Sequence, residues 1–137
     1  MKGNEMETKE KTLAEYIDEI GLQVAIKPCN MPATAPKWAK LSHNAYRVTL
    51  KYQDRKMSHY FYAGALVKDL KPADIVADLA KNWDTCIYNL QDFGDEFGWN
   101  SETFKTYKAV QRLGRRYADL IGDSDIRCEL GELASEY

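Results

Sequence analysis

The 137-residue chain has few of the features that identify an enzyme. It has only two histidines, His43 and His59, and its three cysteines, Cys29, Cys86 and Cys128, show no metal-site spacing such as CxxC or HExxH. It has neither a GxGxxG nor a GxxxxGK[ST] phosphate loop, and no GxSxG turn around a serine nucleophile. These absences argue against catalysis, so we expect a protein that is not an enzyme and that holds no metal and no cofactor.

Long apolar runs are also missing. No stretch approaches the roughly 18–20 apolar residues that span a bilayer, and the polar start MKGNEMETKEK is unlike a signal peptide. The odd, scattered cysteines predict free thiols and not a disulfide framework. The sequence therefore predicts a cytoplasmic protein with no membrane partner.

What is present is the composition of a globular domain. Hydrophobic residues make up 45% of the chain and charged residues 29%, which are ordinary proportions. The formal net charge of −2 provides no bulk attraction to nucleic acid or to anionic membranes. The length suits one domain, which we place at residues 12–137, after a flexible charged tail at 1–11.

Periodicity predicts an N-terminal helix followed by three strands. The segment TLAEYIDEIG at 12–21 combines capping-box spacing with apolar residues at helical intervals and a terminal glycine. A first strand follows at 22–28, and we expect Pro28 to end it. Alternation of apolar and polar residues at 45–53 and 57–64 predicts a hairpin with its turn at the DRK between them.

The second half of the chain has helical periodicity. Pro72 suits the first turn of a helix, and the apolar stripe of this helix comprises Ile75, Val76, Leu79, Trp83, Ile87 and Leu90. A short helix at 90–100, a long helix to Gly122 that either Asn100 or Ser101 caps, and an acidic helix at 124–137 follow. The predicted fold is an α+β domain with an N-terminal helix, a three-stranded antiparallel sheet and then three to four packed helices.

The long helix has two different sides. Its aromatic and apolar residues share one side, which predicts core. Gly114 lies on that side, and because glycine costs up to ~1 kcal/mol in a helix relative to alanine, we expect another backbone to approach closely there. The cations of this helix lie mainly on the opposite side: Lys105, Lys108, Arg112, Arg115 and Arg116.

The long connection at 29–44 is either a simple crossover or a functional loop. This connection contains Trp38, whose position decides whether Tyr60 and Tyr62 are exposed. These two tyrosines share one face of the second hairpin strand. Either Trp38 covers these tyrosines, or they form an exposed aromatic strip that joins two copies of the chain in a homodimer.

Charge is segregated along the chain. Cations dominate 37–71 and 103–118, and acids dominate 72–102 and 119–137. Either the basic and acidic elements lie side by side and make weak surface pairs, or they form separate patches for charged partners. The candidates for an acidic partner-binding face are Asp74, Asp78, Asp84, Asp92, Asp95 and Glu96. The candidates for nucleic-acid binding are Arg47, Lys51, Lys105, Lys108, Arg112, Arg115 and Arg116.

Four segments resemble a group of small phage and prophage proteins of uncharacterised function. They are LAEYIDEIG, HNAYRVTLKYQDRKMSHYFYAG, PADIVADLA and LQDFGDEFGWNSETFKTYKAVQRLGRRYADLIGD, which together span most of Leu13 to Asp123. The resemblance implies a phage-encoded accessory protein that acts in the cytoplasm of a bacterial host cell, and such genes include anti-CRISPR inhibitors of host defence. We therefore expect inhibition of a bacterial defence complex, a CRISPR effector, whose basic nucleic-acid channel would receive the acidic face.

The alternative is nucleic-acid binding. The predicted α-β-β-β-α order of residues 12–90 resembles the double-stranded RNA-binding domain, which contacts phosphates with cations at the start of its last helix. The corresponding stretch KDLKPADIVADLAK contains Lys68 and Lys71 but lacks the dense lysine cluster of that family. Asp74 and Asp78 follow directly, and their charge would repel phosphate.

Overall fold

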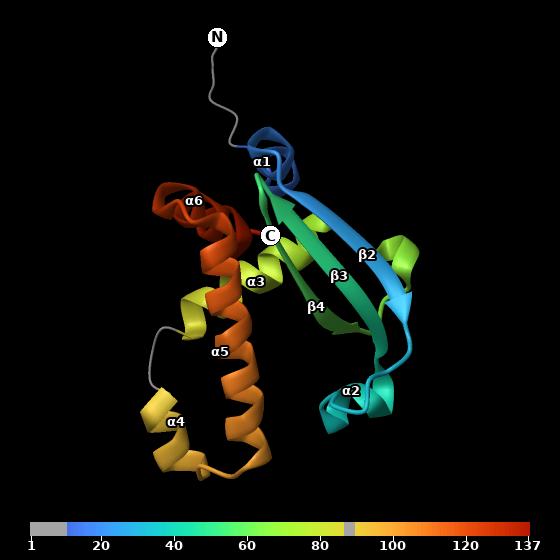
Figure 1. Cartoon of the computed structure of the whole chain (residues 1–137), viewed down its shortest axis with the longest axis vertical. Coiled ribbons are helices and arrows are strands. Elements are labelled where there is room, and N and C mark those ends of the chain that lie inside the picture. The colour runs from blue at the N-terminus through green and yellow to red at the C-terminus, as the bar shows by residue number, and fades with distance from the viewer. Residues whose placement is uncertain (1–10, 87–89) are drawn as a thin grey trace.

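The computed structural model describes residues 11–86 and 90–137, with side-chain environments for 11–83 and 94–137. The chain forms the expected α+β fold, in which a three-stranded antiparallel sheet follows an N-terminal helix and precedes the remaining long helices (Figure 1). In chain order the elements are α1 (Leu13–Ile20), β2 (Gln23–Cys29), α2 (Lys37–Ser42), β3 (Asn44–Tyr52), β4 (Arg55–Ala63), the 3-10 turn η1 (Val67–Asp69), α3 (Pro72–Cys86), α4 (Leu90–Phe97), α5 (Glu102–Ile121) and α6 (Ser124–Ser135).

The start of α1 confirms the predicted capping box. The Thr12 hydroxyl accepts a hydrogen bond from the Glu15 backbone N–H at 3.1 Å, and the Glu15 carboxylate accepts one from the Thr12 N–H at 2.8 Å. Gly21 ends the helix in the left-handed conformation with φ 76°, where glycine has no steric penalty. Leu13 and Ile17 are the buried residues of this short helix.

The sheet has the order β2-β3-β4, so β3 is central and β2 and β4 are both edges. The register places Val48 of β3 opposite Ile26 on one side and His59 on the other. In β3, the face that starts at Tyr46 is buried, whereas Arg47 on the other face is exposed. Helices α3 and α5 pack against the buried face, and the opposite face lies toward solvent.

The prediction that Pro28 ends the first strand is wrong. Strand β2 continues to Cys29, and Pro28 stands opposite Tyr46 in the register. Because β2 is an edge strand, a residue without a backbone N–H can sit where that group would only have faced solvent.

The hairpin turn is one residue earlier and tighter than predicted. Only Gln53 and Asp54 separate the strands, and Tyr52 stands opposite Arg55. Gln53 has φ 57°, the left-handed conformation that two-residue hairpin loops use. Glutamine is an uncommon residue in this conformation, so the sequence contained no turn signal of the Asn-Gly type.

Gly114 confirms the predicted close approach of two backbones. A Cβ atom at this position would lie 3.1 Å from Cα and 3.3 Å from the backbone N of Trp83 in α3. The missing side chain therefore lets α5 lie directly on α3. The aromatic residues of the same side, Phe104, Tyr107 and Tyr117, are buried as expected.

The predicted stripe of α3 is confirmed at its start, where Ile75, Val76 and Leu79 are buried. Trp83 is only partly buried against the core, and the Arg127 guanidinium of α6 lies 5.8 Å from the centre of its ring. Ile87 and the side chain of Leu90 lie outside the described part of the chain.

Helix α5 is held against the sheet at one end only. The Arg55 side chain of β4 donates hydrogen bonds to the carbonyls of Leu120 and Ile121, at 2.7 and 3.1 Å, where a cation also interacts favourably with the helix dipole. Toward its start, α5 runs past the sheet and carries α4 (Figure 1). This divergence opens a space beside β4.

Candidate functional site

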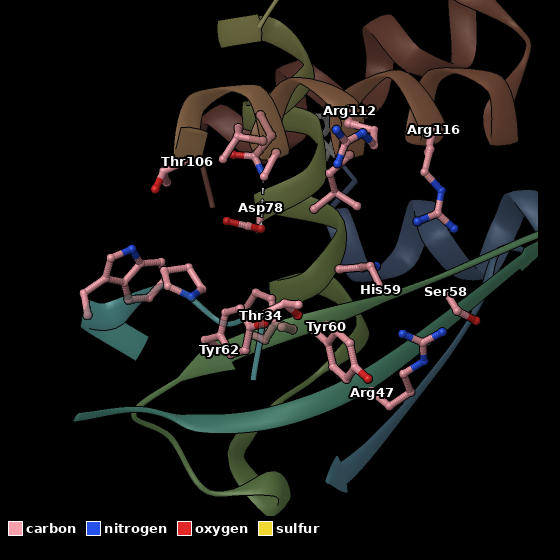
Figure 2. A pocket seen from close by; sticks show the side chains of 17 residues that line it. Thr34, Arg47, Ser58, His59, Tyr60, Tyr62, Asp78, Thr106, Arg112 and Arg116 are labelled. Atoms are coloured by element: carbon pink, nitrogen blue, oxygen red, sulfur yellow. Dashed lines mark hydrogen bonds between the residues drawn. The ribbon is translucent and has the colours of Figure 1, made fainter. Parts of the chain in front are cut away.

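The space beside β4 is a cavity of about 740 Å³, which we call the β4–α5 groove. Residues from the middle of β4 form one wall, α5 forms the opposite wall, and Asp78 of α3 lies between them (Figure 2). Asn82 of α3 also lines the cavity. Trp38, at the start of α2, also lines the groove. The groove therefore runs along the free edge of the sheet.

Small side chains on α5 explain why the groove is not filled. Thr106, Ala109 and Val110 line it, and their helical spacing places them on one side of α5. Arg55 holds the C-terminal end of α5 on the sheet. The three small side chains lie nearer the start of the helix, on the side of that contact where the groove is open.

The aromatic wall of the groove supports each of the two interpretations of Tyr60 and Tyr62 in part. Trp38 packs edge-on against Tyr62, with ring centres 5.9 Å apart, as the covered interpretation predicted. Tyr60 remains 41% exposed, as the aromatic-strip interpretation predicted. A homodimer through these tyrosines stays a prediction, with only Tyr60 widely available for it.

Three arginines surround the groove. Arg47 lies over the Tyr60 ring, 4.9 Å from its centre, and Arg112 and Arg116 project from α5 (Figure 2). Arg112 and Arg116 are exposed, and among the described residues no hydrogen bond or ion pair engages their guanidinium groups. Two guanidinium groups at one wall of the cavity thus have no hydrogen-bond or ion-pair partner among the described residues.

The other basic candidates do not join this cluster. Lys51, Lys105, Lys108 and Arg115 are exposed, but none of them lines the groove. The structure thus brings together three of the seven predicted cations, one from the sheet and two from α5.

The acidic candidates are not gathered on one exposed face within the described side chains. Asp74 accepts hydrogen bonds from the Lys71 backbone N–H at 2.8 Å and from the Tyr137 hydroxyl, and the latter bond raises the pKa of Tyr137 to about 12. Asp78 lines the groove, while Asp95 and Glu96 are exposed on α4. The side chains of Asp84 and Asp92 lie outside the described residues.

Two titratable side chains lie deep in the groove. His59 is 6% exposed, and neither ring nitrogen has a hydrogen-bond partner within the described chain. Burial lowers the pKa of His59 to about 4, with help from the charges of Arg116 and Arg47, so the ring is neutral at pH 7. Burial also raises the pKa of Asp78, although a hydrogen bond from Asn82 at 3.3 Å opposes the shift.

The lowered pKa of His59 predicts a specific loss of stability in acid. The unfolded chain takes up a proton near pH 6.5 and the folded chain only near pH 4, so stability is complete above pH 6.5 and falls as the pH drops toward 4. Between about pH 7.5 and pH 4.5 the free energy of unfolding should fall by roughly 2–3 kcal/mol through this group. Urea unfolding at both pH values measures the change.

His59→Gln is the matched control for this prediction, because glutamine has a similar size and does not titrate. Asp78, whose pKa shift works in the opposite direction, is present in both proteins and cancels from the comparison. An acid-induced loss of the same size in wild type and variant would contradict the assignment.

The described residues contain neither a metal site nor a membrane-spanning helix. No group of three or more His, Cys, Asp and Glu side chains in the described residues could hold a metal ion. Cys29 and Cys128 are free thiols, and the side chain of Cys86 lies outside the described set. Across residues 11–86 and 90–137, no helix is long and apolar enough to cross a bilayer.

Sequence reasoning did not select His59 or Asn82 as site residues. The signal available for His59 was its place between Met57 and Phe61 on the inward face of a strand, where a polar side chain needs a partner. Nothing in the sequence indicated that Asn82 of α3 and Arg112 of α5 would line the same cavity, because that depends on how the helices cross.

Comparison with known proteins identifies no relative: no family model matches the chain, and no curated protein or solved structure matches it significantly. The similarity to small phage proteins therefore stays a prediction. The function has to be argued from the groove itself.

Proposed function

We propose that this chain is a binding protein that takes a single-stranded nucleic acid in the β4–α5 groove. The observation that carries the proposal is the position of Arg47, Arg112 and Arg116 around the same cavity as Trp38 and Tyr60. Cationic and aromatic side chains interleaved along one groove are the combination that binds single strands.

Each part of the groove suits one part of a nucleotide. Guanidinium groups bind phosphate oxygens with two parallel hydrogen bonds, and Arg112 and Arg116 have no hydrogen-bond or ion-pair partner among the described residues. The exposed ring of Tyr60 and the half-exposed ring of Trp38 offer surfaces on which bases stack. The volume of about 740 Å³ is in the range of sites that enclose small ligands.

A single strand fits these features better than a duplex. Bases paired inside a duplex cannot stack on side chains. The duplex-binding mode would also need cations at the start of α3, where the Asp74 carboxylate instead accepts the Lys71 N–H. The expected α-β-β-β-α order is present, with α2 inserted between the first two strands. The start of α3, however, provides a poor site for phosphate.

The test is fluorescence anisotropy of a labelled single-stranded oligonucleotide titrated with the protein at several salt concentrations. With about three phosphates contacted, the slope of log affinity against log salt should be about −2, from roughly −0.7 per contact on single strands. The same sequence as a duplex should bind more weakly. Absence of any complex at the lowest salt would overturn the proposal.

A second function is favoured by a different surface. Around α4, the exposed acids Asp95 and Glu96 lie next to Phe97 and Trp99, which are 44% and 52% exposed. Trp99 packs against Phe104 with ring centres 4.9 Å apart. Exposed aromatic residues in a fixed position are typical anchors of protein interfaces, so this acidic and aromatic surface suits the predicted inhibition of a bacterial defence complex.

Pull-down of CRISPR effectors with the purified protein tests this second function. Asp95→Lys combined with Glu96→Lys should abolish retention, because both changes reverse charge at exposed positions without touching the core. The groove variant Arg112→Ala with Arg116→Ala should retain the partner as well as wild type does. Retention of no effector by the wild-type chain would remove the hypothesis.

A further inference from the structure

The face of the sheet that points away from α3 and α5, which we call the open face, is basic. Side chains alternate between the two faces along each strand, and four exposed cations point outward on this one: Lys27 of β2, Arg47 and Lys51 of β3, and Lys56 of β4. None of the residues in the three strands, which the structure describes completely, is an acid. The strands themselves therefore provide no negative charge to balance these cations.

The register places the four cations opposite one another. Lys27 stands directly opposite Arg47, and Lys51 directly opposite Lys56. Like charges in this position destabilise an antiparallel sheet. Asp119 of α5 lines a small cavity together with Lys56, but among the described residues no ion pair engages any of the four cations. The repulsion within the sheet is thus not offset by the protein.

Protection of the sheet edges explains only half of this arrangement. Lysine on an edge strand hinders edge-to-edge aggregation, which suits Lys27 and Lys56. Arg47 and Lys51 belong to the central strand β3, which has no free edge. Their charge costs stability there without that benefit, so it indicates an anionic ligand that lies on the open face.

The open face is continuous with the β4–α5 groove. Arg47, Ser58 and Tyr60 belong to both, and Arg47 and Tyr60 lie side by side (Figure 2). Beyond them only short side chains follow on β3 and β4, where the Thr49 and Ser58 hydroxyls are hydrogen-bonded at 3.0 Å. Lys51 lies four residues from Arg47, or about 13 Å along the strand at roughly 3.3 Å per residue. A chain that leaves the groove at Arg47 thus meets no large side chain before it reaches Lys51.

We infer that the single strand bound in the groove continues over the open face, where Lys27, Lys51 and Lys56 bind its phosphates. The inference rests on the proposed function and deepens it, because it predicts a longer site with more phosphate contacts. The Cβ atoms of directly opposite residues are about 5 Å apart, so Lys51 and Lys56 can reach neighbouring phosphates. Lysine binds phosphate as a point charge on a flexible stem, which suits a strand without a fixed helical shape.

The experiment measures fluorescence anisotropy of labelled oligothymidine strands of about four and about twelve nucleotides, lengths within the usual range of single-strand sites. The short strand should contact the groove alone, and the long strand should reach the open face as well. The salt slope of the long strand should be steeper by about 2, from three further contacts at roughly 0.7 each.

Lys51→Gln combined with Lys56→Gln tests the open face separately from the groove. With the long strand, the variant should lose about 1.4 of the salt slope, so the advantage of wild type should grow about 7-fold as salt falls from about 200 to about 50 mM. The short strand should bind both proteins equally. The variant should melt no lower than wild type, because it removes a pair of opposed like charges.

The matched control is Lys68→Gln with Lys71→Gln, which removes the same charge from exposed positions outside the open face. This control should bind the long strand nearly as well as wild type. An equal loss of affinity in the two double variants would overturn the open-face site, because net charge alone would then explain the effect.

The remaining results separate this inference from the proposed function. Equal salt slopes for the two strand lengths would overturn the open-face site and leave the groove proposal standing. Absence of binding to both strands at the lowest salt would overturn the proposed function itself. Displacement of the long strand by polyglutamate at the same charge concentration would overturn the assignment to nucleic acid and indicate an acidic protein as the partner of the open face.

Discussion

Replacing Arg112 and Arg116 together by alanine is expected to weaken single-strand binding by at least about 100-fold, because hydrogen bonds to charged groups contribute roughly 1.5–3 kcal/mol each where they are well formed and each 1.4 kcal/mol corresponds to about a factor of ten. Both side chains are exposed and make no contact within the described chain that the fold needs, so the variant should fold normally. The salt slope should also fall by about 1.4, since two phosphate contacts are lost at roughly 0.7 each.

The same helix offers a charge-matched control. Lys105 and Arg115 are exposed on α5 but do not line the groove, so Lys105→Ala with Arg115→Ala removes the same net charge elsewhere. This control should bind the strand nearly as well as wild type, because it changes only the long-range field. If the two double variants lose affinity equally, the strand binds to the whole basic surface of α5, and the groove is not the binding site.

Gly114→Leu is expected to be the most damaging substitution for the fold. A Cβ at this position already meets the backbone of Trp83 at 3.1 Å, and backbone cannot swing aside as a flexible side chain can. Overpacking commonly costs 1–3 kcal/mol and sometimes more, and here α5 must separate from α3. We expect a loss of about 3 kcal/mol and a fall of roughly 10 °C in melting temperature, measured by calorimetry or circular dichroism.

Gly131→Ala in α6 is the control for the effect of a helical glycine as such. No atom lies within 4 Å of a Cβ built there, so alanine should stabilise the helix by up to ~1 kcal/mol through its higher propensity. The two glycines should therefore respond in opposite directions. A Gly114→Leu protein with an unchanged melting temperature would show that α3 and α5 do not pack as described.

The local features of the fold were predictable because neighbouring residues determine them. The Thr12–Glu15 capping box, the end of α5 at Gly122 and the alternation in β3 were each recognised from a few consecutive residues, and the structure confirms them. For the start of α5 the sequence left Asn100 and Ser101 open, and the structure has Ser101. The errors fell where a local signal depends on surroundings. Pro28 reads as a strand breaker unless the strand is known to be an edge, and Gln53 carries no sign of the turn that it forms.

The site was less predictable than the fold. The sequence identified the cations of α5 and the hairpin but could not select the three that meet. It grouped Asp78 with other acids as part of an exposed face, whereas the structure places it in the groove among arginines and tyrosines. It gave His59 no role, because its burial depends on α5 and α3, which lie far away in the chain.

The sequence by itself determined the order of the three strands and the longer helices, the inward side of α5 and the need for a close backbone approach at Gly114, because periodicity and glycine act through local sterics. Only the tertiary structure decided that α5 stays on the sheet at Arg55 and diverges from it toward the start of the helix, where the groove opens. That divergence follows from how several helices pack together, and it alone brings Arg47, Asp78 and Arg116, from three separate elements, to one cavity.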